Sequence, residues 1–151
     1  MDAFIIPFGL FFYLILFVVW CFFCLSYYNA MKRIPETYQG LPDWLIWFML
    51  IPFIGFIIAW IMLPFGLPRA LMRYSAFEPT LAPLARKLFQ QGLTTQILVT
   101  LSLLFSWLPF IGTLLSIAAL VFFVLYWMGC AEAKRMIRVT GSAGDYAIHN
   151  V

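Results

Sequence analysis

The stretches IPFIGFIIAW (Ile51–Trp60) and LPFIGTLLSI (Leu108–Ile117) share the tetrapeptide Pro-Phe-Ile-Gly, and each lies inside a long apolar run. Proline ends or kinks a helix because it lacks the N–H and clashes with the preceding turn, and glycine allows the backbone to turn. The second copy interrupts Leu93–Ala131, whose 39 residues would form a helix of about 58 Å, about twice the bilayer core. We therefore expect a helical hairpin with its tip at Pro109–Gly112.

The first copy allows two interpretations. The uncharged run Trp44–Pro64 has 21 residues, which matches one membrane span, with Pro52 and Gly55 in its interior. The run is either a kinked span or two half-helices that meet at the tetrapeptide. In the second case Trp44–Leu50, at about 10 Å of helix, is too short to cross and forms a re-entrant loop.

The composition requires lipid as the main solvent. The chain of 151 residues is 65% hydrophobic and 10% charged, and its mean hydropathy is +0.99. In soluble domains about a quarter of all residues are charged. The length suits one membrane domain, and we expect residues 1–140 to form it and residues 141–151 to form a polar C-terminal tail.

The predicted fold is an all-α membrane protein with four membrane-embedded helical segments, the second either spanning or re-entrant, and one interfacial amphipathic helix. The embedded segments are expected at residues 3–30, 44–66, 93–107 and 110–138, and the interfacial helix at 80–91. In that helix an apolar face opposes a polar one, which is typical of a helix at the membrane surface. The alternative is a connector packed on protein. The apolar face holds Leu81, Leu84, Ala85 and Leu88, and the polar face holds Arg86, Lys87, Gln90 and Gln91.

The basic residues bear on the topology. Four full spans with a cytoplasmic N-terminus place seven of the nine Lys and Arg residues inside and leave Lys32 and Arg33 outside, whereas a re-entrant second segment places all nine inside. The re-entrant arrangement brings polar backbone to membrane depth, which requires burial by protein or a lined cavity. We favour four spans, with the C-terminus cytoplasmic.

The cysteines do not predict a redox or metal site. Cys21 and Cys24 have C-x-x-C spacing but lie in the apolar run 3–29, Cys130 lies apart from them, and the single histidine is His149. A structural zinc site needs about four ligands. We interpret the cysteines as small packing residues and expect no metal or other cofactor.

Two stretches resemble a family of uncharacterised small multi-pass bacterial inner-membrane proteins. These are KRIPETYQGLPDWLIWFMLIPFIGFIIAW (Lys32–Trp60) and GTLLSIAALVFFVLYWMGCAEAKRM (Gly112–Met136). The first joins a basic, proline-containing loop to an apolar run with Trp and Ile-Pro, and the second ends in Tyr-Trp, small residues and basic residues. The resemblance implies a bacterial inner-membrane protein of about four helices and brings no active site.

The apolar runs contain no Asp, Glu, Lys, Arg or His. Proton-coupled pumps and ion exchangers need an ionisable group at membrane depth, so the sequence argues against those classes. Because the basic residues all lie between or after apolar runs, membrane lipids are expected partners and nucleic acid is not. Four of these residues, Arg69, Arg73, Arg86 and Lys87, can bind lipid headgroups or simply orient the chain.

The favoured function is a non-enzymatic accessory or scaffold subunit that packs against another integral membrane protein or against itself. One alternative is an oligomeric transporter or pore for a neutral or apolar substrate, for which we would expect a polar cavity lined by Thr100, Ser102 and Ser106. The other is a lipid-modifying enzyme, which needs Glu78 or Glu132 close to Arg69.

Overall fold

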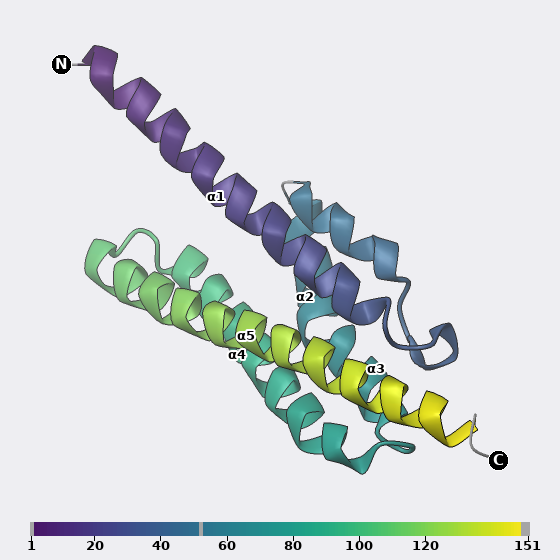
Figure 1. Ribbon diagram of the computed structural model, residues 1–151. Helices are drawn as coiled ribbons and strands as arrows, with labels where there is room; N and C mark the ends of the chain where they lie inside the picture. The colour runs from purple at the N-terminus through teal and green to yellow at the C-terminus, as the bar shows by residue number, and fades with distance from the viewer. Residues whose placement is uncertain (1, 52, 149–151) are drawn as a thin grey trace.

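The computed structural model describes residues 2–51 and 53–148, with side chains described at 11, 14–51 and 53–137, and every element in this part of the chain is helical. Five α-helices are joined by three short 3-10 helices (Figure 1). In chain order they are α1 (Asp2–Met31), η1 (Glu36–Tyr38), η2 (Asp43–Leu50), α2 (Ile54–Phe65), α3 (Leu67–Tyr74), η3 (Pro79–Leu81), α4 (Ala82–Leu104) and α5 (Pro109–Ile148).

Helices α1 and α5 run parallel along each other. The indole of Trp20 stacks on Phe123 with ring centroids 5.2 Å apart, and Arg33 donates a hydrogen bond of 3.1 Å to the Lys134 carbonyl. The two pairs are separated by 103 and 101 positions, a nearly constant offset that only a parallel pair gives. Figure 1 shows the N-terminal part of α1 diverging from the rest of the molecule.

The second Pro-Phe-Ile-Gly copy marks the start of α5, and the predicted hairpin is confirmed. The chain turns at residues 105–108, Pro109 is the first residue of α5, and the Gly112 N–H donates to the Leu108 carbonyl at 2.9 Å. The two arms stay in contact, since the hydroxyls of Ser102 and Ser116 lie 2.6 Å apart. The tetrapeptide is therefore the first helical turn after the tip rather than the tip itself.

The first copy also forms a hairpin, which corresponds to the second of the two interpretations, two half-helices that meet at the tetrapeptide. The chain reverses between η2 and α2, Phe53 has φ 65°, and the two arms pack against each other. The two arms can pack this closely because residue 55 is a glycine, since a Cβ at this position would collide with the Met49 carbonyl. Pro52 lies outside the described residues.

A break at Gly66 separates α2 from α3 and leaves two backbone groups without their helical hydrogen-bond partners. Two buried tyrosines form hydrogen bonds to these groups instead. In an unbroken helix the Leu67 N–H would donate to the Leu63 carbonyl. Here the Leu67 N–H donates to the Tyr27 hydroxyl at 2.6 Å, and the Tyr126 hydroxyl donates to the Leu63 carbonyl at 2.7 Å. Tyr27 is fully buried, and its hydroxyl also donates to the Met62 carbonyl at 2.6 Å.

The predicted interfacial helix at 80–91 and the segment at 93–107 are a single helix, α4. The apolar face was predicted correctly, but it is covered by protein rather than by lipid headgroups, because Leu81, Leu84, Ala85 and Leu88 belong to the core. Gly92 continues the helix instead of ending it, and a Cβ there would lie 2.7 Å from the Leu63 carbonyl oxygen. Gly92 thus allows α2 and α4 to pack closely within a continuous α4.

At the C-terminal end, α5 continues through residues that the sequence assigned to a polar tail. The helix ends at Ile148, and residues 149–151 lie outside the described part.

Three helical segments of the described residues are long and apolar enough to cross a membrane, namely Leu14–Met31, Ile54–Tyr74 (α2 with α3) and Pro109–Ile137. These segments indicate a membrane-embedded protein. The four spans predicted from the sequence are not all found, because α4 is not among the three.

Replacing Tyr27 by Phe is expected to lower the free energy of unfolding by about 2–4 kcal/mol, because the Leu67 N–H and the Met62 carbonyl both lose a buried partner. Tyr126→Phe, which removes one such bond, is expected to cost about 1–3 kcal/mol. Unfolding titrations in mixed micelles would measure both. Tyr28→Phe is the matched control, because the Tyr28 ring is only half-buried, and a loss at Tyr28 equal to that at Tyr27 would contradict the expectation.

Candidate functional site

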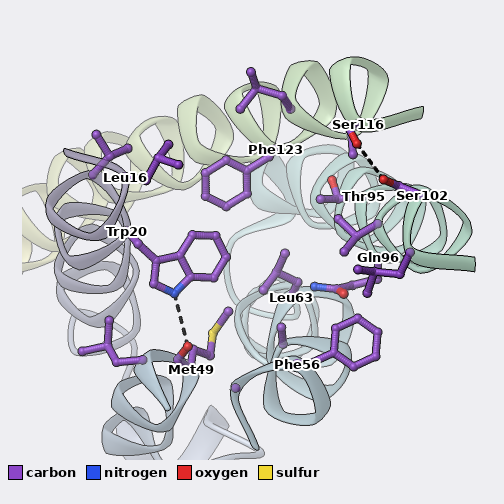
Figure 2. Close-up of a pocket in the computed structure, with 18 of the residues that line it drawn as sticks. Leu16, Trp20, Met49, Phe56, Leu63, Thr95, Gln96, Ser102, Ser116 and Phe123 are labelled. Atoms are coloured by element: carbon purple, nitrogen blue, oxygen red, sulfur yellow. Dashed lines mark hydrogen bonds between the residues drawn. The ribbon is translucent and has the colours of Figure 1, made fainter. Parts of the chain in front are cut away.

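A partly open cavity of about 640 Å³ lies between α1, the first hairpin and the α4–α5 hairpin (Figure 2). Its volume lies within the range of about 300–1,000 Å³ that is usual for sites that hold one small molecule. Every one of these elements contributes to the wall: Trp20 comes from α1, Met49 from η2, Phe56 from α2, Gln96 from α4 and Phe123 from α5.

Apolar side chains form most of the wall. Trp20 and Phe123 stack on one side, and Leu63 and Phe56 lie opposite them (Figure 2). The Trp20 indole N–H already donates to the Met49 carbonyl at 3.3 Å, so this end of the cavity offers no free donor from the indole. Such a surface favours a hydrocarbon or ring system of low polarity.

Four polar side chains lie on the α4–α5 side of the cavity. Thr95 donates its hydroxyl hydrogen to the Gln91 carbonyl at 2.7 Å, and Ser116 donates to the Gly112 carbonyl at 2.9 Å. The hydroxyls of Ser102 and Ser116 also share a hydrogen bond of 2.6 Å, in which either can be the donor. All three hydroxyls therefore have a hydrogen-bond partner within the α4–α5 hairpin.

The fourth polar group, Gln96, is buried and incompletely satisfied. The side chain is 4% exposed, and its Oε1 has no hydrogen-bond partner within the described structure. Figure 2 shows the amide extending into the cavity region next to Leu63 and Phe56. The Oε1 of Gln91, which does not line the cavity, is also buried without a partner in the described structure. A buried oxygen without a donor destabilises a protein by about 1–3 kcal/mol.

None of the described residues that line the cavity carries a charge. Transferring an unpaired charge into such surroundings is very unfavourable, so the cavity suits a neutral molecule. No group of three or more His, Cys, Asp or Glu side chains gathers in the described residues, and the three cysteines are unpaired thiols, of which Cys24 and Cys130 are buried. The side chains at the cavity can bind and orient a molecule through packing and hydrogen bonds.

The fold places some of the residues predicted from the sequence at the cavity and others away from it. Gly55 lines the cavity, and Gly112 is buried at the start of α5, where a Cβ would lie 3.1 Å from the Phe105 carbonyl oxygen. Of the serine and threonine residues expected to line a cavity, Ser102 does so. Thr100 instead accepts a hydrogen bond of 3.2 Å from Trp60, and Ser106 is exposed at the second hairpin tip.

The four basic residues proposed for lipid headgroups lie outside the cavity. Arg69 and Arg73 are exposed on α3, with the Arg69 guanidinium 4.5 Å from the centre of the Phe65 ring, and Arg86 and Lys87 are exposed on the first turns of α4. A separate hollow of about 290 Å³ is lined by Asn29, Lys32, Arg33 and Lys134. The structure thus brings together basic residues that are 100 positions apart and were not grouped from the sequence.

Gln96 and Thr95 were missed as site residues. One available signal was the amide itself, a polar side chain within a 39-residue run without charges. The sequence does not show that the amide faces Trp20 and Phe56, because those residues come from other helices.

Comparison of the chain with protein-family models, with curated proteins and with solved structures yields no match.

Replacing Gln96 by Met is expected to raise the free energy of unfolding of the ligand-free protein by about 1–2 kcal/mol, because an unbranched apolar side chain of similar length removes the unpaired oxygen. Gln90→Met is the control, since Gln90 is exposed on the same helix and its replacement should change little. Unfolding titrations of delipidated protein in micelles would show the difference. A clear destabilisation by Gln96→Met would mean that the oxygen has a partner in the free protein.

Proposed function

We propose that this protein is a non-enzymatic membrane protein that binds one neutral, largely apolar molecule in the cavity between α1, the first hairpin and the α4–α5 hairpin. The observation that carries the proposal is the cavity itself, which is lined mostly by apolar side chains and is uncharged along its described wall. Its walls come from exposed apolar helices, so a molecule dissolved in the bilayer reaches it sideways from the lipid.

The proposal follows the transporter alternative from the sequence more closely than the accessory-subunit role. Binding of a neutral or apolar molecule is the first step of its transport, and it needs no ionisable group at membrane depth. The accessory-subunit role stays a prediction, because the apolar side chains exposed on α1 and α5 are also those that any lipid-facing helix presents. The bacterial inner-membrane location likewise stays a prediction from the family resemblance.

The arrangement of the helices supports a re-entrant topology in preference to four spans. The Arg33–Lys134 hydrogen bond and the contact between the Tyr38 and Tyr74 rings, whose centroids are 5.6 Å apart, bring the loop after α1, the end of α3 and the polar part of α5 together at one end of the molecule. The basic residues of the described part lie in or near these segments, so this end carries the positive charge. By the positive-inside rule it faces the cytoplasm, with the C-terminus.

The depth of each hairpin agrees with this topology. Helix α4 is less apolar than the three segments named above, but with 23 residues and a length of about 34 Å it is long enough to cross a hydrocarbon core of about 30 Å. The first hairpin reaches only the level of Trp20, about 18 Å along α1 from Lys32. We therefore propose three crossings, by α1, α4 and α5, and one half-depth hairpin made of η2 and α2, whose polar backbone is covered by protein on one side and lines the cavity on the other.

Single cysteines in a variant without native cysteines test the topology. Thr37 follows α1, Thr80 precedes α4, and Ser106 lies at the second hairpin tip; all three are exposed. An impermeant maleimide applied to intact cells is expected to label Ser106→Cys, and to label Thr37→Cys and Thr80→Cys only after lysis. Labelling of Thr37→Cys and Thr80→Cys on opposite sides would mean four full spans.

Photo-crosslinking tests the binding site. A hexadecyl chain with a diazirine, added to the protein in nanodiscs, is expected to crosslink residues of the cavity wall, and unlabelled chains should compete for them. Ala119→Phe, which fills the cavity, should remove most of this labelling, whereas Ala118→Phe on the neighbouring position, outside the cavity wall, should not. Peptide mapping by mass spectrometry gives the sites, and circular dichroism confirms that both variants fold.

Crosslinks confined to outward-facing positions such as Leu114 and Leu125, with the cavity wall unlabelled, would overturn the proposed function.

A further inference from the structure

We propose that the hollow lined by Asn29, Lys32, Arg33 and Lys134 binds a phosphate group, such as that of an anionic phospholipid. The hollow lies between the C-terminal end of α1 and the polar part of α5, which are side by side in Figure 1. It shares no lining residue with the apolar cavity, so phosphate binding here is independent of what the cavity holds.

The hollow brings together three positive charges that have no carboxylate partner. In the part of the chain that the structure describes, neither Lys32, Arg33 nor Lys134 forms an ion pair. The nearest carboxylates along the chain, Glu36 and Glu132, are exposed and do not line the hollow. Cations that lie close together repel each other, and an anion placed between them replaces this repulsion by attraction. The charges therefore favour an anionic ligand.

The hydrogen-bond donors of the hollow suit a phosphate. Arg33 uses one N–H for the 3.1 Å hydrogen bond to the Lys134 carbonyl, which holds the guanidinium between the two helices and leaves its other N–H groups free to bind a ligand. The Lys32 ammonium lies 5.6 Å from the centre of the Tyr28 ring, a contact that occupies no acceptor. The Asn29 amide has no hydrogen-bond partner in the described structure. A guanidinium fork, ammonium groups and an amide N–H match an anion that has several acceptor oxygens.

The position of the hollow favours a phosphate that belongs to a lipid. The apolar segments Leu14–Met31 and Pro109–Ile137 both end beside it, at the depth where the headgroups of a bilayer begin. On the face of α1 that carries Asn29, the residues four and seven positions earlier are Leu25 and Phe22, and both are exposed. A lipid whose phosphate lies in the hollow can therefore lay an acyl chain along this face.

The same charges distinguish between phospholipids. Phosphatidylcholine carries an ammonium group of its own, for which the hollow offers no carboxylate. Phosphatidylglycerol ends in a neutral glycerol, so the charge of its phosphate is not compensated within the headgroup. We therefore expect the hollow to prefer phosphatidylglycerol.

Native mass spectrometry of the full chain, released from neutral micelles, tests the site. The protein is titrated with phosphatidylglycerol and, separately, with phosphatidylcholine at one ionic strength. The first phosphatidylglycerol is expected to bind with a Kd about tenfold lower than that of the first phosphatidylcholine. The variant Lys134→Gln is expected to lower this preference about fivefold, and it keeps the backbone carbonyl to which Arg33 donates.

Lys87→Gln is the matched control. Lys87 is exposed on α4 and does not line the hollow, so this variant loses the same charge away from the proposed site. It should keep the preference for phosphatidylglycerol within about twofold, because an exposed charge away from the site contributes little. Circular dichroism checks that both variants are folded.

Isothermal titration with glycerol 3-phosphate distinguishes the two sources of the phosphate. Preference for phosphatidylglycerol that is lost in Lys134→Gln and kept in Lys87→Gln means that the hollow holds a lipid phosphate. Equal affinity for the two lipids, together with glycerol 3-phosphate binding to the original protein and not to Lys134→Gln, means that the hollow holds the phosphate of a soluble compound.

Three outcomes would overturn the proposal. An equal loss of preference in Lys134→Gln and Lys87→Gln would mean that the overall positive charge of this end attracts the lipid. A preference that both variants keep in full would place the lipid elsewhere on the protein. Equal affinity for the two lipids without any binding of glycerol 3-phosphate would mean that the hollow holds no phosphate.

Discussion

The fold depends on a requirement that holds for any backbone in lipid. Each backbone N–H or carbonyl group that is not hydrogen-bonded within a helix needs another hydrogen-bond partner. The break at Gly66 releases the Leu67 N–H and the Leu63 carbonyl, and the hydroxyls of Tyr27 and Tyr126 take their places. Because Tyr27 belongs to α1 and Tyr126 to α5, the hydrogen bonds at the break between α2 and α3 also hold α1 and α5 against it. Close packing at the same point needs Gly92, whose missing side chain lets α4 reach the Leu63 carbonyl.

The cavity follows from the limited depth of the first hairpin. The reversal between η2 and α2 and the contact of Gly55 with the Met49 backbone end the η2–α2 pair at about the level of Trp20. Beyond this tip no further helix of the described residues lies between α1 and the α4–α5 hairpin, and α1 diverges (Figure 1). The same break in the helix that gives the re-entrant shape thus leaves the space in which a ligand can lie.

The polar side of the cavity combines three hydroxyls that have hydrogen-bond partners with one amide oxygen that has none in the described structure. Three hydroxyls are satisfied by oxygen atoms of their own hairpin, which keeps α4 and α5 in register through Ser102 and Ser116. Gln96 Oε1 is left bare, at a cost that packing by Met or Leu would avoid. Local departures of this kind from full hydrogen bonding are typical of functional sites.

The sequence by itself indicated that the chain is surrounded mainly by lipid, that it is helical, and where its long apolar runs are interrupted. Hydropathy and charge indicated helices in lipid, the length of Leu93–Ala131 required a turn near Pro109, and the spacing of Leu81, Leu84, Ala85 and Leu88 identified an apolar face, because these features depend on residues close together in the chain. Only the tertiary structure decided that the first tetrapeptide is a hairpin, that the face on α4 is covered by protein, and that Gln96 lies at a cavity. Each of these depends on contacts across tens of positions, such as Trp20 with Met49 or Tyr126 with Leu63, and no local pattern specifies which distant helix supplies the partner.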